Sequence, residues 1–198
     1  MTVVDTSWML DAAPPEWLRI PWLGADVDLD KWREDAALIF RLLEDVDRQV
    51  VEPGTAPRAG LDIDDAIATL LAFSSGLPDG HDLVAGLSVP GRWPLPVIVS
   101  VTASGADEDL LSAAGARGGH AIEAPVVEYL PEELGDGIRV TRFDLDDDGT
   151  VWASVCCARR AAGLDTVLTW RTSELDLVPL FSPLLESLLA AVRTGDGR

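Results

Sequence analysis

Helical periodicity is clearest near the start of the chain. From Asp30 onward, apolar residues recur at a spacing of about 3.6, with charged residues between them. The apolar stripe of this predicted helix consists of Trp32, Ala36, Ile39, Phe40, Leu43 and Val46. Asp30 is expected to cap the helix, because an Asp side chain at that position accepts a hydrogen bond from a free backbone N–H.

Three further helices are predicted from similar patterns. One runs from Asp62 to Phe73 and is ended by Gly76 and Pro78. A short helix is expected from Asp107 to Ala116, where a Gly-rich run through Gly119 stops it. The face of the last helix contains Leu177, Phe181, Leu184, Leu188 and Val192. Pro183 should either kink that helix or lie in its first turn.

Short apolar runs bounded by Gly and Pro predict the strands. These runs are Trp17–Ile20, Leu83–Val89, Leu95–Val101, Ala121–Tyr129, Ile138–Leu145, Val151–Arg159 and Leu164–Arg171. The second and third flank a turn-rich Pro90–Pro94 and should form a hairpin. The pattern predicts an α+β fold: a single domain with a mostly antiparallel sheet of about six to seven strands flanked by helices.

Length and composition agree with one globular domain. The chain has 198 residues, of which 47% are hydrophobic and 25% charged. We expect an N-terminal arm over residues 1–15, one domain over residues 16–193 and a flexible tail over residues 194–198. The chain contains no internal repeat of fixed period, so a solenoid is not expected.

The charge limits the partners. With 34 acidic and 15 basic residues the formal net charge is −19, which repels nucleic acid and anionic membrane surfaces. Met1–Leu10 contains no basic residue of the kind that opens a signal peptide, and Leu175–Val192 is interrupted by charges and prolines. The expected location is the cytoplasm and the expected partner another protein, with a homodimer left open.

Cysteine chemistry is not indicated. The two cysteines are neighbours, Cys156 and Cys157, and would point to opposite faces of a strand. They favour two buried thiols over a redox pair, and no zinc spacing is present.

An acidic loop offers a calcium-like motif. Asp144–Gly149 places carboxylates at alternate positions before a glycine, as an EF-hand loop does. The twelfth position, which should be a bidentate Glu, is Val155. A hairpin turn explains the segment better than a cation site, because Asp-Gly is typical of such turns.

Candidate catalytic residues are few. His81 and His120 both lie beside glycines and are better explained as loop or strand-edge residues than as general bases. Carboxylate pairs such as Asp64-Asp65 fall where a helix start or a loop is expected. We therefore predict no enzyme, no catalytic residue, no cofactor and no bound metal.

Aromatic residues supply the candidate interaction site. Four of the seven tryptophans, Trp17, Trp32, Trp152 and Trp170, fit core patterns, whereas Trp8 lies on the arm and Trp93 on the hairpin tip. Candidate partner-binding residues are Trp8, Leu10, Arg92 and Trp93. Of these, Trp8 is expected to dock on the protein itself and Trp93 to meet a partner.

The order of elements resembles a known superfamily. The segments that carry the likeness are Trp17–Pro21, Leu95–Val101, Gly137–Arg142, Val167–Trp170 and Leu177–Phe181. In this order they are similar to the PsbP-like superfamily, which includes a Ran-binding nuclear import factor and many small actinobacterial proteins. The resemblance implies an antiparallel sheet flanked by helices that binds proteins without shared catalytic residues. The helices over residues 30–73 are longer than in the import factor, so Ran binding is not carried over.

Three functions follow from these patterns. The first is a non-enzymatic interaction protein, such as an adaptor, a secretion accessory or an immunity-type inhibitor, that uses an acidic surface and exposed aromatics. The second is a small-molecule binder with an apolar cavity between sheet and helices, and the third is an enzyme with an unfamiliar carboxylate site.

Overall fold

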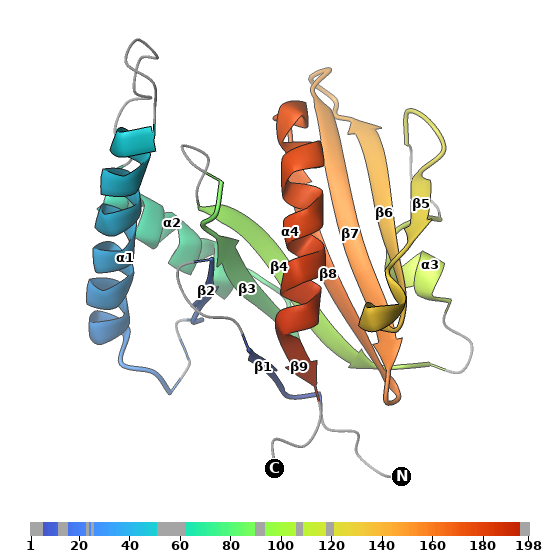
Figure 1. Ribbon diagram of the computed structural model, residues 1–198, viewed down its shortest axis with the longest axis horizontal. Coiled ribbons are helices and arrows are strands. Elements are labelled where there is room, and N and C mark those ends of the chain that lie inside the picture. The colour runs from blue at the N-terminus through green and yellow to red at the C-terminus, as the bar shows by residue number, and fades with distance from the viewer. Residues whose placement is uncertain are drawn as a thin grey trace. The chain divides into compact units, whose positions relative to one another are not determined.

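The fold is α+β. The structure is a computed structural model that describes residues 6–11, 16–22, 24, 26–49, 62–89, 94–105, 109–117 and 121–194, with the backbone of residue 50. Its main sheet has the strand order β2-β3-β4-β8-β7-β6-β5, and four α-helices are found in the described part of the chain (Figure 1). The α+β class and the predicted strand number are confirmed. The chain forms two compact units, residues 13–96 and residues 1–12 with 97–198.

The unit over residues 13–96 pairs two strands and two helices. Strand β2 (Trp17–Ile20) runs antiparallel to β3 (His81–Gly86), with Trp17 opposite Gly86. The hydroxyl of Ser74, on α2 (Ile63–Ser75), donates to the Ile20 carbonyl at 3.4 Å. The predicted end of this helix at Gly76 is confirmed, and Asp62 is its N-cap.

Helix α1 (Leu29–Val50) begins earlier than the sequence predicts. The backbone N–H of Lys31 donates to the Asp28 carboxylate at 3.1 Å, so Asp28 and not Asp30 caps the helix. Phe40 is fully buried on the inner face, as expected. The assignment of Val46 to that face was wrong, because its side chain is 53% exposed. It lies on an outward stripe with two exposed leucines, Leu38 and Leu42.

The other unit is built on a meander. Strands β6 (Asp136–Leu145), β7 (Val151–Ala161) and β8 (Leu164–Thr172) pair antiparallel in succession, and β8 also pairs with β4 (Leu95–Ala103). Strand β5 (Val126–Tyr129) pairs with the outer side of β6. The prediction of one strand from Ala121 to Tyr129 was too long, because Ala121 makes only an isolated bridge before Pro125.

Two helices cover opposite faces of this meander. Helix α4 (Val178–Ala191) packs Phe181 against Trp170 on β8, with ring centroids 4.6 Å apart. Helix α3 (Leu110–Ala113) packs on the other face, where Ile138, Val140 and Cys156 form a buried cluster. It is shorter than predicted and ends before Gly115, which takes a positive φ of 71°.

Details of α4 differ from the prediction. Leu185 is fully buried, whereas the predicted Leu184 is only half-buried. Pro183 lies inside the helix and not in its first turn, which instead contains Pro179. The short segments η1 (Glu132–Leu134) and η2 (Leu175–Leu177) are 3₁₀ turns.

The two ends of the described chain form a separate ribbon. Strand β1 (Trp8–Leu10) runs antiparallel to β9 (Val192–Thr194), and the Asp11 N–H donates to the Ala191 carbonyl at 2.8 Å. Part of the predicted arm is therefore a strand, and Thr194, assigned to the tail, is paired in β9. No helix in the described ranges is long and apolar enough to cross a membrane.

Candidate interaction surface at the β5 edge

Of the four residues singled out as partner-binding, the structure describes Trp8 and Leu10. Trp8 is 8% exposed within the β1–β9 ribbon, in agreement with the expected docking of this side chain. Leu10 is half-buried in the same ribbon. Arg92 and Trp93 lie outside the described residues.

The predicted cysteine environment is confirmed. Cys156 and Cys157 are free thiols on opposite faces of β7, and both are buried. Burial raises the pKa of Cys156 to about 11 and that of Cys157 to about 12, so both stay protonated near neutral pH.

The acidic loop is a hairpin turn, as predicted. It joins β6 to β7, with the Gly149 N–H donating to the Asp146 carbonyl at 2.9 Å and Gly149 at φ 84°. Asp144 is held by Arg142, whose Nε donates to its carboxylate at 2.8 Å. Across the described residues, no group of three His, Cys, Asp or Glu side chains could hold a metal ion.

His81 is not brought together with a catalytic partner among the residues that the structure describes. His81 is exposed, and its Nδ1 lies 3.4 Å from the carbonyl of Asp79. His120 lies outside the described residues.

The structure points instead to β5, the last strand of the sheet. The N–H of Leu130 donates to the carbonyl of Gly137 at 3.0 Å, which makes this opposed pair hydrogen-bonded. Along an antiparallel ladder, hydrogen-bonded pairs alternate with pairs that are not hydrogen-bonded. Glu128, two residues before Leu130, therefore also bonds to β6. The N–H and C=O groups of Val127 and Tyr129 point away from β6. An outer strand could pair with these two residues.

Prolines limit the length of this edge. Pro125 and Pro131 lie two residues outside Val127 and Tyr129, at the next outward-facing positions. Proline has no N–H to donate, and such placement on an edge strand restricts uncontrolled pairing. The part of the edge that can pair with another strand is therefore short and lies between the two prolines.

The side chains at this edge are unusually apolar for a surface. Four large hydrophobic residues are exposed within eight positions: Ile122 (54%), Val126 (50%), Val127 (40%) and Tyr129 (87%). Tyr129 is the most exposed large hydrophobic residue in the described chain. Val127 and Tyr129 lie on one face of β5 and Val126 lies on the other, and exposed apolar side chains at a sheet edge are typical of a binding surface.

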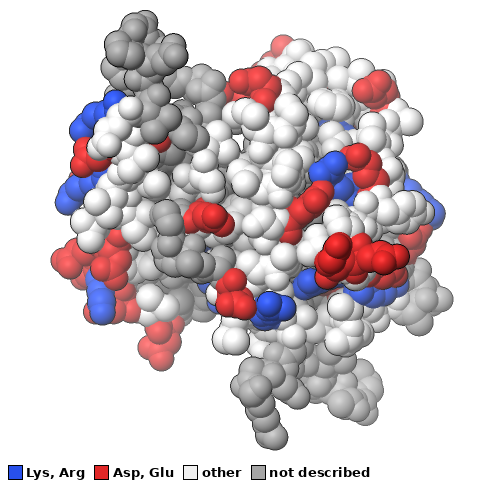
Figure 2. Space-filling model, viewed as in Figure 1, with Lys and Arg blue, Asp and Glu red and all other residues white. Residues whose placement is uncertain are grey.

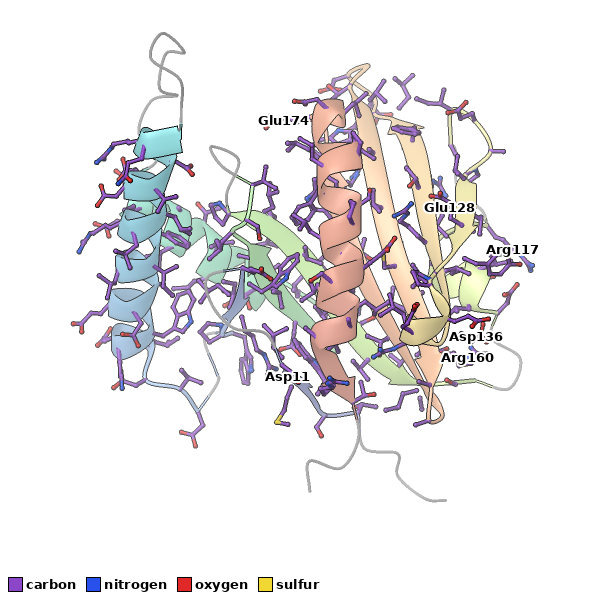
Figure 3. All side chains as sticks on the ribbon, in the orientation of Figure 1. Asp11, Arg117, Glu128, Asp136, Arg160 and Glu174 are labelled. Carbon is purple, nitrogen blue, oxygen red and sulfur yellow. The ribbon has the colours of Figure 1, made fainter. Side chains whose placement is uncertain are left out.

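Acidic residues surround the edge. Residues 121–136 contain no Lys or Arg, and their acidic members are Glu123, Glu128, Glu132, Glu133 and Asp136. Acidic side chains gather over η1 in the space-filling view (Figure 2), and Glu128 and Asp136 both lie on the β5 side of the sheet (Figure 3). The segment therefore presents a negative potential to an approaching chain.

One internal cation reaches this surface. Arg139 on β6 donates to Oε2 of Glu128 from Nη2 at 2.7 Å, and its Nη1 donates to Glu186 on α4. Burial of the guanidinium, the largest single effect, lowers the pKa of Arg139, but the hydrogen bond to Glu128 and the charges of Glu128 and Glu186 together outweigh it, so the pKa is raised. Arg139 thus fixes the position of Glu128 while that carboxylate remains half-exposed.

Sequence reasoning missed this site because it read β5 as part of a longer strand. Strand length and edge position depend on pairing, which the apolar pattern alone does not give. The signal that could have found it is the short run Val126–Tyr129 between two prolines, followed by acidic η1.

Comparisons with known proteins add little. No family model matches the chain, and no curated protein matches it in sequence. Among solved structures it is similar to a protein from Bacteroides thetaiotaomicron VPI-5482, with 10% identity and a TM-score of 0.38. The match covers 61% of this chain and 41% of the Bacteroides chain, and it carries no functional argument.

Proposed function

We propose that this protein is a non-enzymatic interaction module that binds an extended, basic segment of a partner protein by adding a strand to β5. The observation that carries the proposal is the open edge of Val127 and Tyr129 within an apolar and acidic surface. In strand addition, main-chain hydrogen bonds provide affinity and alternate side chains provide specificity.

The chemistry of the partner follows from the two faces of β5. Val127 and Tyr129 lie on the α3 face with Val140 and Ile138, so apolar residues of the partner belong opposite them. Glu128 lies on the other face, where an Arg or Lys of the partner would face it. The best segment therefore alternates β-branched and basic residues.

A second copy of the chain fits this edge poorly. A symmetric antiparallel pair that uses Val127 and Tyr129 of both copies must be centred on Glu128. This places two Glu128 carboxylates directly opposite each other, which is destabilising. It also brings together two chains that each have a formal net charge of −19 and repel each other. Charge thus favours a basic partner over a homodimer.

The proposal can be tested with a model peptide, acetyl-Lys-Val-Arg-Val-Lys-amide. In the antiparallel register its Arg faces Glu128 and its valines face Val127 and Tyr129. Backbone NMR titration should shift residues 126–130, with a dissociation constant of about 0.1–1 mM that weakens as salt is added. The acidic peptide acetyl-Glu-Val-Glu-Val-Glu-amide should not bind.

Two variants separate the edge from the rest of the surface. Val127→Pro removes an outward N–H and should abolish peptide binding, and Tyr129→Ala should weaken it about fivefold or more. Leu180→Ala, which removes another exposed apolar side chain (59%), is the matched control and should bind normally. The proposal fails if the acidic peptide binds equally well, or if Tyr129→Ala keeps full affinity.

A further inference from the structure

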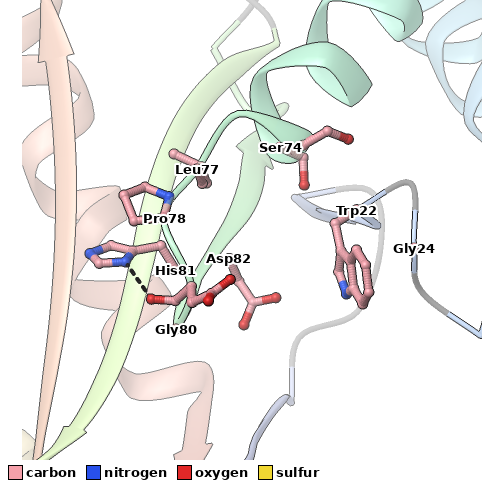
Figure 4. A pocket seen from close by; sticks show the side chains of 10 residues that line it. Trp22, Gly24, Ser74, Leu77, Pro78, Gly80, His81 and Asp82 are labelled. Carbon is pink, nitrogen blue, oxygen red and sulfur yellow. Dashed lines mark hydrogen bonds between the residues drawn. The ribbon is translucent and has the colours of Figure 1, made fainter.

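A separate hollow lies in the unit over residues 13–96. It has a volume of about 490 Å³, within the range of small-ligand sites. Trp22 lines one side, His81 and Asp82 line the other, and Ser74 lies between them at the end of α2 (Figure 4). The His81 ring is turned away from Trp22, toward the carbonyl of Asp79.

A glycine makes room for the tryptophan wall. Trp22 is 55% exposed, and its ring passes so close to Gly24 that a Cβ there would lie 1.7 Å from Cζ3 of the indole. Only glycine at this position leaves the ring where it is. The exposed indole therefore offers an open aromatic face to a ligand in the hollow.

The remaining wall is acidic and hydroxylic. Asp79 and Asp82 both line the hollow, together with Ser74, and no Lys or Arg is among the lining residues. Arg19 contacts Asp82 from β2 at 3.1 Å. Asp79 forms no ion pair with a residue described by the structure.

We propose that this hollow binds an organic cation of the alkylammonium class, either as a free amine or as a side chain of a protein. An indole face attracts ammonium groups through its quadrupole, and Asp79 and Asp82, which line the same hollow, add direct charge attraction. A neutral ligand of the same shape gains neither interaction. This site is distant in sequence from the β5 surface and does not depend on the function proposed for it.

Choline and its uncharged isostere 3,3-dimethylbutan-1-ol are the probes for a titration followed by NMR of the Trp22 indole N–H. That signal is assigned by its loss in Trp22→Phe. Choline should shift it saturably with a dissociation constant in the millimolar range, and the isostere should bind at least about fivefold more weakly. A trimethyllysine tripeptide distinguishes the sources, because tighter binding than choline indicates a protein side chain.

Variants test the two parts of the hollow separately. Trp22→Leu and Asp79→Asn should each weaken choline about fivefold or more, whereas Asp64→Asn, an exposed carboxylate on α2, should have no effect. For Trp22→Leu, binding is followed by calorimetry, and thermal unfolding verifies that the fold persists. Equal binding of choline and its isostere, or unchanged choline affinity in both variants, would overturn the proposal.

Discussion

The ion pair between Arg160 and Asp165 gives a quantitative test of the described packing. Asp165 is 2% exposed, and Arg160 holds it through two hydrogen bonds of 2.7 Å, from Nε to Oδ1 and from Nη2 to Oδ2. The Ser104 hydroxyl donates a third, also at 2.7 Å. The pair lies at the end of the β7–β8 hairpin, near Asp136 (Figure 3).

Replacing Arg160 by Met leaves a buried carboxylate whose one remaining side-chain partner among the described residues is Ser104. Breaking a buried ion pair costs about 3–5 kcal/mol, and the lower end applies because the Arg160 side chain is 32% exposed. We therefore expect Arg160→Met to lower the free energy of unfolding by about 3 kcal/mol near neutral pH. Arg33→Met, which removes a solvent-exposed pair with Asp30, is the control and should cost under about 0.5 kcal/mol.

The loss should depend on pH in a defined direction. Hydrogen bonds from Arg160 lower the pKa of Asp165 in the native protein. The ionised Asp165 therefore stabilises the native protein fully above the unfolded pKa of about 3.9. This stabilisation is lost as the pH falls through the lowered native pKa. In Arg160→Met burial instead raises that pKa, so the carboxylate destabilises the fold at high pH and protonation relieves this.

Urea unfolding at two pH values measures this effect. The deficit of Arg160→Met should be smaller by about 1 kcal/mol at about pH 5.0 than at about pH 7.5. A deficit below about 1 kcal/mol near neutral pH, or one that grows on acidification, would refute the reasoning.

Three further predictions concern other parts of the molecule. Phe40→Ala should destabilise by about 3–5 kcal/mol in urea unfolding, whereas Leu42→Ala on the exposed side of the same helix should cost under about 0.5 kcal/mol; similar losses would contradict the assigned faces. Cys156 and Cys157 should not react with Ellman's reagent in the native state but should react fully in urea, because burial raises their pKa values; rapid native labelling would contradict this. Calorimetric titration with millimolar calcium should show no stoichiometric binding at Asp144–Gly149, and micromolar affinity would disprove the assignment as a turn.

The meander from β6 to β8 could be predicted from the sequence because its determinants are local. Strand runs alternate there with tight turns, and Asp-Gly at Gly149 specifies the first hairpin. The ends of helices were less certain, since Asp28 and Asp30 are equally suitable caps by residue type.

Long-range pairing could not be predicted. Trp8 finds its partner strand at Thr194, and three-residue strands give no periodic signal. The outward position of Val46 on α1 likewise needed the structure, because its spacing fits the apolar stripe until its neighbours are known. The candidate site at β5 could not be predicted for the same reason, because only the pairing of the whole sheet shows that β5 has a neighbour on one side.

Amide hydrogen exchange at β5 tests the strand-addition proposal most directly. In the free protein, the N–H groups of Val127 and Tyr129 should exchange quickly, while that of Glu128, bonded to β6, should be protected. Saturation with the basic pentapeptide should slow Val127 and Tyr129 by about tenfold or more and leave Glu128 unchanged. Protection of Val127 and Tyr129 without peptide, or no change when it binds, would contradict strand addition at this edge.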